Sequence, residues 1–181
     1  MDKLEPWEID MTGIIRRHAI RLFRGLPGSG KTTAAREWLA RMGGGVLLEA
    51  DQFFTDEAGV YRFDPTRVGE AHTWTQQNLI RALDKGVSHI AVANTFTQAW
   101  ELDPYMGIIR AYGQREGHDV GWKVITVRTN LSPEQLAARN LHGVTVETIK
   151  RMATWWEDSW REGNPVPPWE RNVILGRGGA R

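Results

Sequence analysis

The sequence contains no cysteine. This absence excludes disulfide bonds, thiolate catalysis and metal sites with cysteine ligands. The five histidines are scattered and show no spacing typical of metal ligands. No apolar run approaches the roughly 20 residues that a transmembrane helix needs, and residues 1–6 show no signal-peptide pattern. We therefore expect a soluble, cytoplasmic protein that has no membrane partner.

The charged residues show no strong excess of either sign. Lysine and arginine number 23, and aspartate and glutamate number 22, which gives a net charge of +1 at pH 7. A dedicated nucleic-acid-binding domain is usually far more basic, so the charge neither requires nor excludes a polynucleotide substrate. The nine tryptophans could stack on bases, but large aromatic side chains more often fill cores. The length of 181 residues is that of one domain.

A glycine-rich segment at residues 25–32 matches the phosphate-binding motif G-x-x-x-x-G-K-[ST] at every fixed position. It follows an alternating apolar run at residues 18–24 and precedes a helical pattern that begins near Thr32, as the motif requires. This context disfavours the alternative of a glycine-rich turn that only caps a helix. The predicted nucleotide-binding residues are Gly25, Leu26, Pro27, Gly28, Ser29, Gly30, Lys31, Thr32 and Thr33.

The residue types indicate how this loop would bind a nucleoside triphosphate. Glycines can adopt backbone angles closed to other residues, so consecutive amide groups can form a concave anion site. The helix that follows adds the positive end of its dipole. Lys31 can reach the β- and γ-phosphates, the Thr32 hydroxyl can bind magnesium, and Thr33 assists at the phosphate. We therefore expect ATP and Mg²⁺ as cofactors.

Short apolar runs alternate with helical patterns along the chain. Buried parallel strands are predicted at residues 18–24, 46–50, 88–93 and 121–128, with a last edge strand at 173–175. Helices are predicted at residues 31–42, 65–85 and 104–116, behind the Ser132 capping box up to Asn140, and at 145–160. Residues 52–63 predict a loop. The alternation indicates an α/β fold of the P-loop NTPase type, with a doubly wound parallel sheet of about five strands.

We expect one folded domain at residues 18–162, which includes a helical lid around residues 129–160. Residues 1–17 are polar and predict an N-terminal tail. Residues 163–181 follow a proline-rich break and predict a C-terminal tail or the edge strand.

In a parallel sheet of this kind, ligands bind outside the carboxyl ends of the strands. That rule brings together the phosphate loop, Asp51, Asn94 and the segment after Arg128. The third strand ends at Ala93 and Asn94 and so lacks the acid that water-activating NTPases keep there for magnesium. A kinase that acts on a hydroxyl instead needs a carboxylate to accept the proton of that hydroxyl, and Asp51 is the candidate. The alternative for Asp51 is a turn cap.

An ordered set of motifs then resembles a family, the polynucleotide-kinase-type P-loop kinases. The resemblance covers about residues 18–160 and extends well beyond the phosphate loop, which many families share. The matching positions are Ala50 to Phe54, Tyr61, Phe63, Asp64, Ala71, His72, Trp74, Asn94, Thr95, Trp100, Glu101, Pro104, Tyr105, Arg139, Asn140, His142, Gly143 and Val144.

What the resemblance implies is phosphorylation of a hydroxyl group on DNA or RNA by ATP. By motif match, Lys31 and Thr32 would hold ATP and magnesium, and Asp51 would be the general base. Arg139 would be the lid arginine that stabilises charge on the transferred phosphoryl group, with Arg128 as the competing choice. The family often has an acid where this chain has Ala93. Magnesium is then left to Thr32, with Asp51 or Asn94 bound through water.

Tyr61, Arg62, His72 and Asn94 could line the acceptor site, although such a cluster is more often helix packing. The acceptor stays open between a polynucleotide 5′-hydroxyl and the hydroxymethyl group of 5-hydroxymethyluracil in DNA, which bacteriophage enzymes of this type phosphorylate. The absence of a second phosphatase or ligase domain favours the base-modifying interpretation. We expect DNA more than RNA as substrate, and no obligate protein partner. For a phage protein, the location would be the host cytoplasm.

Other classes of protein share parts of this pattern. Kinases of small molecules, such as zeta-type toxins that act on nucleotide sugars and antibiotic phosphotransferases, have the same loop and the acid after the second strand. A nucleotide-binding module without catalysis is a further alternative, but such a module has no need of Asp51. A motor ATPase is disfavoured because the third strand lacks its terminal acid.

Overall fold

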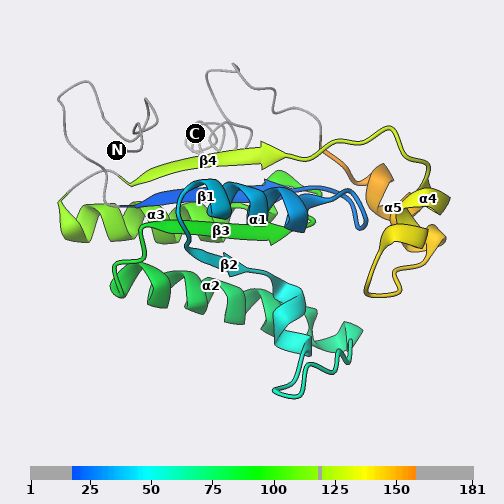
Figure 1. Ribbon diagram of the computed structural model, residues 1–181, viewed down its shortest axis with the longest axis horizontal. Coiled ribbons are helices and arrows are strands. Elements are labelled where there is room, and N and C mark those ends of the chain that lie inside the picture. The colour runs from blue at the N-terminus through cyan, green and yellow to red at the C-terminus, as the bar shows by residue number, and fades with distance from the viewer. Residues whose placement is uncertain (1–17, 118–119, 158–181) are drawn as a thin grey trace, which may run out of the picture.

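The computed structural model describes residues 18–117 and 120–157. Within them, four strands form one sheet in the order β2-β3-β1-β4, and every neighbouring pair is parallel (Figure 1). The strands are β1 (Ala19–Arg24), β2 (Val46–Leu48), β3 (His89–Asn94) and β4 (Gly121–Thr126). The sequence predicted about five strands; the fifth, at residues 173–175, lies outside the described residues, as do both predicted tails.

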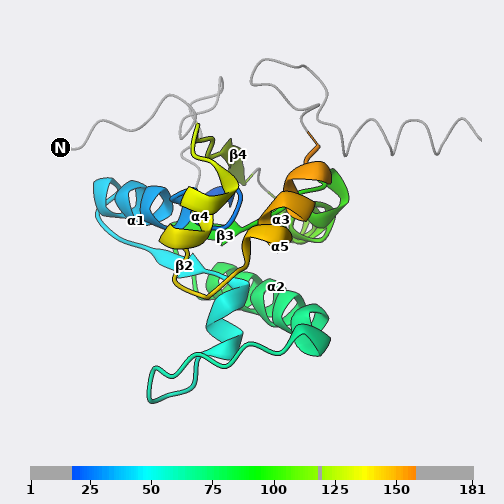
Figure 2. The same cartoon turned by 90° about the vertical axis from the view of Figure 1, so that its right-hand side faces the viewer.

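Helices cover both faces of the sheet (Figure 2). Helix α1 (Lys31–Arg41) packs on one face, and α2 (Val68–Asp84) and α3 (Asp103–Glu116) pack on the other. Because side chains alternate along a strand, β1 places Phe23 against α1 and both Ile20 and Leu22 against α2 and α3. The predicted doubly wound α/β fold is therefore confirmed.

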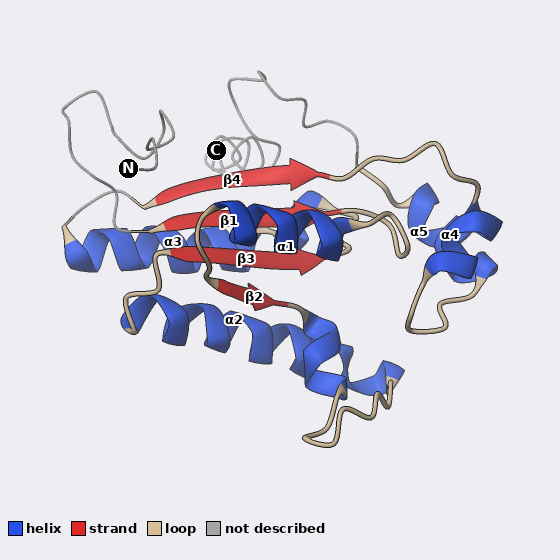
Figure 3. Cartoon of the chain, viewed as in Figure 1, coloured by secondary structure: helices blue, strands red, loops and turns tan. Residues whose placement is uncertain are grey.

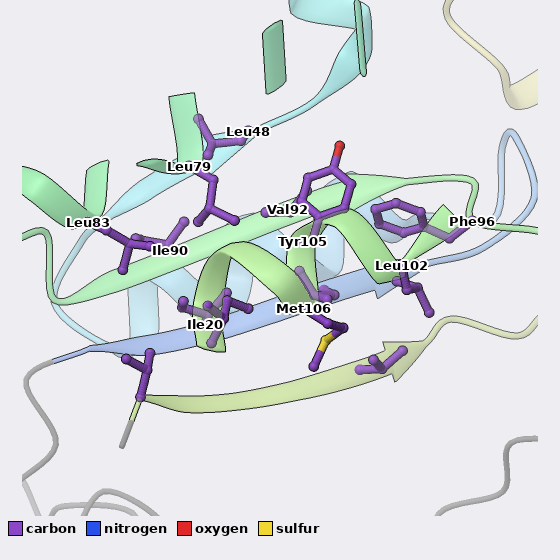
Figure 4. Close-up of a cluster of buried hydrophobic side chains, with 14 of the residues drawn as sticks. Ile20, Leu48, Leu79, Leu83, Ile90, Val92, Phe96, Leu102, Tyr105 and Met106 are labelled. Atoms are coloured by element: carbon purple, nitrogen blue, oxygen red, sulfur yellow. The ribbon is translucent and has the colours of Figure 1, made fainter. Parts of the chain in front are cut away.

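The larger hydrophobic core lies between the sheet and helices α2 and α3 (Figure 4). Ile90 and Val92 of β3 are buried there against Leu79 of α2 and against Tyr105 and Met106 of α3. Burial of a large apolar side chain stabilises the folded state by roughly 1.5–3 kcal/mol. This packing fixes β3 beside β1, and so fixes the relative position of their carboxyl ends.

Two short helices, α4 (Pro133–Arg139) and α5 (Val146–Thr154), lie beyond the carboxyl ends of the strands (Figures 1 and 3). The capping box at the start of α4 is present as predicted. The Gln135 amide donates to Ser132 Oγ over 3.3 Å, and the Ser132 amide donates to Gln135 Oε1 over 2.8 Å. Lys150 of α5 forms an exposed ion pair with Glu134 of α4, at 3.0 Å.

Helix α5 is shorter than the helix predicted at residues 145–160. After Thr154 the chain turns back towards the sheet: the Glu157 amide donates to the Thr97 carbonyl over 2.8 Å. The buried Arg24 guanidinium lies 4.2 Å from the ring centroid of Trp156 and donates to the Glu157 carbonyl over 3.2 Å. These contacts are made in place of further helix; residues 158–160 lie outside the described part of the chain.

The second strand also ends earlier than predicted. The sequence predicted a strand at residues 46–50 and a loop from residue 52, but β2 ends at Leu48 and a 3₁₀ helix, η1 (Ala50–Phe54), follows. The Glu49 amide donates to Gln52 Oε1 over 3.0 Å, and the Ala50 amide donates to Asn94 Oδ1 over 2.9 Å. Because side chains take these two amides, the strand ladder stops. Asp51, expected at the strand tip, lies instead in η1.

The remaining helix boundaries follow the predictions closely. Asp64 caps as predicted, since its Oδ1 accepts a hydrogen bond from the Thr66 amide over 2.9 Å. The first turn is a 3₁₀ helix, η2 (Pro65–Arg67), and α2 follows it directly. A further 3₁₀ turn, η3 (Ala99–Glu101), precedes α3. Among the described helices, none has the length and apolar character needed to cross a membrane.

The central packing predicts the effect of a core substitution. Leu22 is fully buried in β1, so Leu22→Ala should lower the free energy of unfolding by about 2–5 kcal/mol, as measured by urea denaturation. The matched control is Ile80→Ala on α2, where the side chain is 41% exposed and the loss should be much smaller. Equal losses in the two variants would contradict the assigned core.

Candidate active site

The phosphate loop leads directly from β1 into α1. Gly28 and Gly30 have φ angles of 76° and 94°, in the left-handed region that favours glycine. Gly30 is the N-cap of α1, and no side chain caps this helix. The first amide groups of α1 are therefore available to an anion, and the helix dipole favours negative charge at this end.

The loop is also tightly packed, which requires glycine for a second reason. A Cβ atom at Gly25 would collide with the Ser29 side chain, and a Cβ atom at Gly28 would collide with the Leu136 carbonyl oxygen of α4. The Ser29 hydroxyl is buried and has no hydrogen-bond partner among the described residues. A glycine cradle with an unpaired buried hydroxyl and an uncapped helix start fits a bound polyphosphate.

Lys31 begins α1 among negative charges. Burial lowers the pKa of its ammonium group, while the nearby carboxylates of Asp51 and Glu49 act in the opposite direction and raise it. The phosphate loop therefore faces two acidic side chains from the segment that follows β2. Thr33, the last residue of the predicted nucleotide-binding set, is exposed on α1.

Glu49 contacts the loop directly. The Thr32 hydroxyl donates a hydrogen bond to Glu49 Oε1 over 2.6 Å. Sequence reasoning missed Glu49 and selected Asp51 alone from this segment. The predicted strand ran to residue 50 and so contained Glu49. Because β2 ends at Leu48, Glu49 lies at the carboxyl end of the strand, where ligands bind in such sheets.

Asp51 faces a different set of partners. The Tyr61 hydroxyl donates to Asp51 Oδ1 over 3.0 Å, and His142 Nε2 lies 3.6 Å from Asp51 Oδ2. The Tyr61 and His142 rings lie 4.3 Å apart, centroid to centroid. The loop between α4 and α5 therefore reaches the segment after η1. Burial and the Asp51 charge raise the pKa of Tyr61, so its hydroxyl remains a proton donor at neutral pH.

Asn94 connects the ends of β2 and β3. Its side chain is buried; its Oδ1 accepts from the Ala50 amide over 2.9 Å, and its Nδ2 donates to the Tyr105 hydroxyl over 3.4 Å. The amide thus holds the backbone between Glu49 and Asp51. Sequence reasoning placed Asn94 in the acceptor site or at the metal, whereas these contacts favour a positioning role.

The other two residues predicted for the acceptor site lie in different surroundings. His72 of α2 is half-buried, and burial lowers its pKa against the opposing charges of Glu101 and Asp51. The imidazole is therefore neutral at pH 7 and is close enough to Asp51 to sense its charge. Arg62 is exposed and pairs with Asp56 at 3.1 Å.

Two arginines were predicted as alternatives for the lid. Arg139 is exposed in the last turn of α4 and makes no ion pair within the described residues. It follows Leu136 by three positions, close to the same helix face, and the Leu136 carbonyl lies against Gly28 of the phosphate loop. Arg128 is exposed in the segment between β4 and α4. This contact places α4 against the loop, and the choice between the two arginines stays a prediction.

Solved structures similar to this chain have a kinase-type fold. A chain of the Pnkp1/Rnl/Hen1 RNA repair complex matches with a TM-score of 0.57 and 19% identity, over 81% of this chain and 46% of that one. A gluconokinase from Sinorhizobium meliloti matches with a TM-score of 0.52 and 17% identity, over 81% and 79%. The APS kinase CysC of Mycobacterium tuberculosis, solved with AMPPNP and APS, also has a TM-score of 0.52 and 17% identity, over 91% and 99%. These identities establish the fold alone.

Sequence comparison is more specific. Human NEDD4-binding protein 2 is 40% identical over 131 residues, which are 72% of this chain but only 7% of the human protein. The chain thus corresponds to a small part of that relative. The model of the AAA_33 family, described as an AAA domain, matches residues 20–157, from β1 to the end of the described chain. The protein therefore belongs to this family and has a P-loop kinase-like domain.

Proposed function

We propose that this protein is an ATP-dependent kinase that transfers the γ-phosphate to a hydroxyl group on nucleic acid. The observation that carries the proposal is the position of Asp51, a half-exposed carboxylate close enough to Lys31 of the phosphate loop for its charge to raise the pKa of that lysine. A protein that only bound nucleotides would need the loop but not this carboxylate. The catalytic unit we propose is residues 18–162, with the lid at residues 129–160.

The nucleotide would be held by residues 25–33. The amide groups of the loop and of the first turn of α1 would bind the phosphates, and the Lys31 ammonium group would pair with the γ-phosphate during transfer. Magnesium bound at Thr32 would neutralise charge on the β- and γ-phosphates. Arg139 would stabilise the transferred phosphoryl group from the lid, since α4 rests on the loop.

The transfer itself would use Asp51 as the proton acceptor. The acceptor oxygen forms a bond to the γ-phosphorus, its proton passes to an Asp51 oxygen, and the bond from the γ-phosphorus to the bridging oxygen breaks to release ADP. The Tyr61 hydroxyl donates to one oxygen of Asp51 and His142 lies 3.6 Å from the other, so the half-exposed carboxylate keeps lone pairs that can accept the proton of the acceptor hydroxyl. His142 at 3.6 Å is the weaker partner.

The acceptor we propose is either the hydroxymethyl group of 5-hydroxymethyluracil in DNA or a polynucleotide 5′-hydroxyl. The similarity to a chain of an RNA repair complex supports a polynucleotide. The second candidate is a small-molecule kinase, which the similarities to a gluconokinase and an APS kinase favour.

The acceptor class can be tested by transfer of labelled γ-phosphate from ATP to a panel of substrates. The panel contains oligonucleotides with free 5′-hydroxyls, end-blocked DNA with 5-hydroxymethyluracil, and a mixture of nucleotide sugars. Label on the blocked DNA would identify a base-modifying kinase, and label only on free ends would identify an end-processing kinase. Label on the sugars alone would replace the proposal by the small-molecule kinase.

Lys31→Ala should abolish transfer to whichever acceptor the panel identifies, because it removes the positive charge that pairs with the γ-phosphate during transfer. The matched control is Lys85→Ala, an exposed residue at the end of α2, which should retain wild-type activity. The rates are measured with saturating acceptor. Full activity of Lys31→Ala would discard the assignment of the phosphate loop.

Asp51→Asn should leave ATP binding nearly intact and slow transfer by about two to four orders of magnitude, the usual effect of losing a general base. The comparison uses single-turnover transfer rates together with equilibrium binding of an ATP analogue. Asp84→Asn is the matched control, because Asp84 is an exposed residue that pairs with Arg115. Loss of nucleotide binding in Asp51→Asn would reassign Asp51 to the metal.

A further inference from the structure

The Thr32 hydroxyl already has an acceptor for its proton. It donates to Glu49 Oε1 over 2.6 Å, the short distance of a hydrogen bond to a charged carboxylate. A hydroxyl that binds a metal uses an oxygen lone pair and still has a proton to donate. An acceptor in this position therefore orients the lone pairs of Thr32 and strengthens it as a ligand.

The strand that usually supplies an acid beside such a threonine does not do so here. β3 ends with Ala93 and Asn94, and the Asn94 side chain is occupied by Ala50 and Tyr105. The described residues contain no group of three or more histidine, cysteine, aspartate or glutamate side chains that could hold a metal alone. This arrangement suits magnesium, which keeps several waters and binds through few protein groups together with substrate phosphates.

The two carboxylates after β2 face different partners. Glu49 contacts Thr32 at the phosphate loop, whereas Asp51 contacts Tyr61 and His142 on the acceptor side. One acidic group therefore faces the phosphate loop, and the other faces Tyr61 and His142. The charges of both act on Lys31 and raise its pKa.

The backbone of Glu49 is firmly held. Its amide donates to Gln52 Oε1 over 3.0 Å, and Gln52 Nε2 donates to the Leu47 carbonyl over 3.1 Å. The following amide, of Ala50, is held by the buried Asn94. The constrained backbone fixes where the Glu49 side chain begins, and the hydrogen bond from the Thr32 hydroxyl places its carboxylate.

We propose that Glu49 is a positioning residue for magnesium in the Mg·ATP complex, in place of the acid that β3 lacks. Its carboxylate accepts the Thr32 proton, and its charge favours a hydrated divalent cation beside the threonine. The inference rests on the proposed function, because it requires that the loop binds Mg·ATP. Glu49 is then the acid that supports the metal, and Asp51 is the acid that accepts the proton of the acceptor hydroxyl.

The test measures nucleotide binding as a function of magnesium concentration, with a fluorescent ATP analogue and no acceptor present. Glu49→Gln should raise the Mg²⁺ concentration for half-maximal enhancement of binding by about 10- to 100-fold, the usual cost of losing a group that supports a metal ligand. Binding measured in excess EDTA should not weaken, because the substitution removes a negative charge near the phosphates. Glu37→Gln, an exposed residue of α1, is the matched control and should not shift the Mg²⁺ requirement.

A second variant covers the case in which Glu49→Gln does not fold. Glu49→Asp keeps the charge but is too short for the 2.6 Å contact, so it should shift the Mg²⁺ requirement in the same direction by a smaller factor. An unchanged Mg²⁺ requirement in a folded Glu49 variant would overturn the inference, and so would a shift found only in Asp51→Asn. If the wild type binds no nucleotide at any Mg²⁺ concentration, the proposed function itself fails.

Discussion

The hydrogen bond from the Ala50 amide to Asn94 Oδ1, 2.9 Å long, determines how the site is built. It joins the end of β2 to the end of β3, and it lies between the two acidic residues Glu49 and Asp51. Because Asn94 is buried, its amide group must be paired or its burial would be costly. Together with the bond from the Glu49 amide to Gln52 Oε1, it ends the β2 strand where η1 begins. The two carboxylates, two positions apart, then face different partners.

Under the proposed function, this arrangement separates two tasks. One acid supports the metal, and the other accepts the proton of the reacting hydroxyl. Glu49 lies against the phosphate loop, and Asp51 lies against Tyr61 and His142 of the loop between α4 and α5. The backbone of α4 contacts the phosphate loop at Gly28. After α5 the chain returns to the sheet through Trp156 and Glu157, which contact the buried Arg24 at the end of β1.

Local patterns were sufficient to predict most of the fold. The glycine motif, the capping box at Ser132 and the Asp64 cap involve neighbouring residues, so the sequence contains them directly. The predicted end of β2 was wrong because the true end depends on Asn94, which is 44 positions away from Ala50. For the same reason the sequence could not place His142 beside Asp51, a contact between the lid and η1. Glu49 was missed because it lay inside the predicted strand, and its contact with Thr32 arises only from the packing of α1 beside β2.

The central claim, that Glu49 serves the metal and Asp51 serves the acceptor, is tested most directly by a crystal structure of the protein with Mg²⁺ and a non-hydrolysable ATP analogue. The account predicts a magnesium ion bound by the Thr32 hydroxyl, with Glu49 retaining its hydrogen bond to that hydroxyl. Asp51 should then lie outside the ligands of the ion and face the γ-phosphate from the acceptor side. A magnesium ion coordinated by Asp51, with Glu49 turned away from Thr32, would contradict the account.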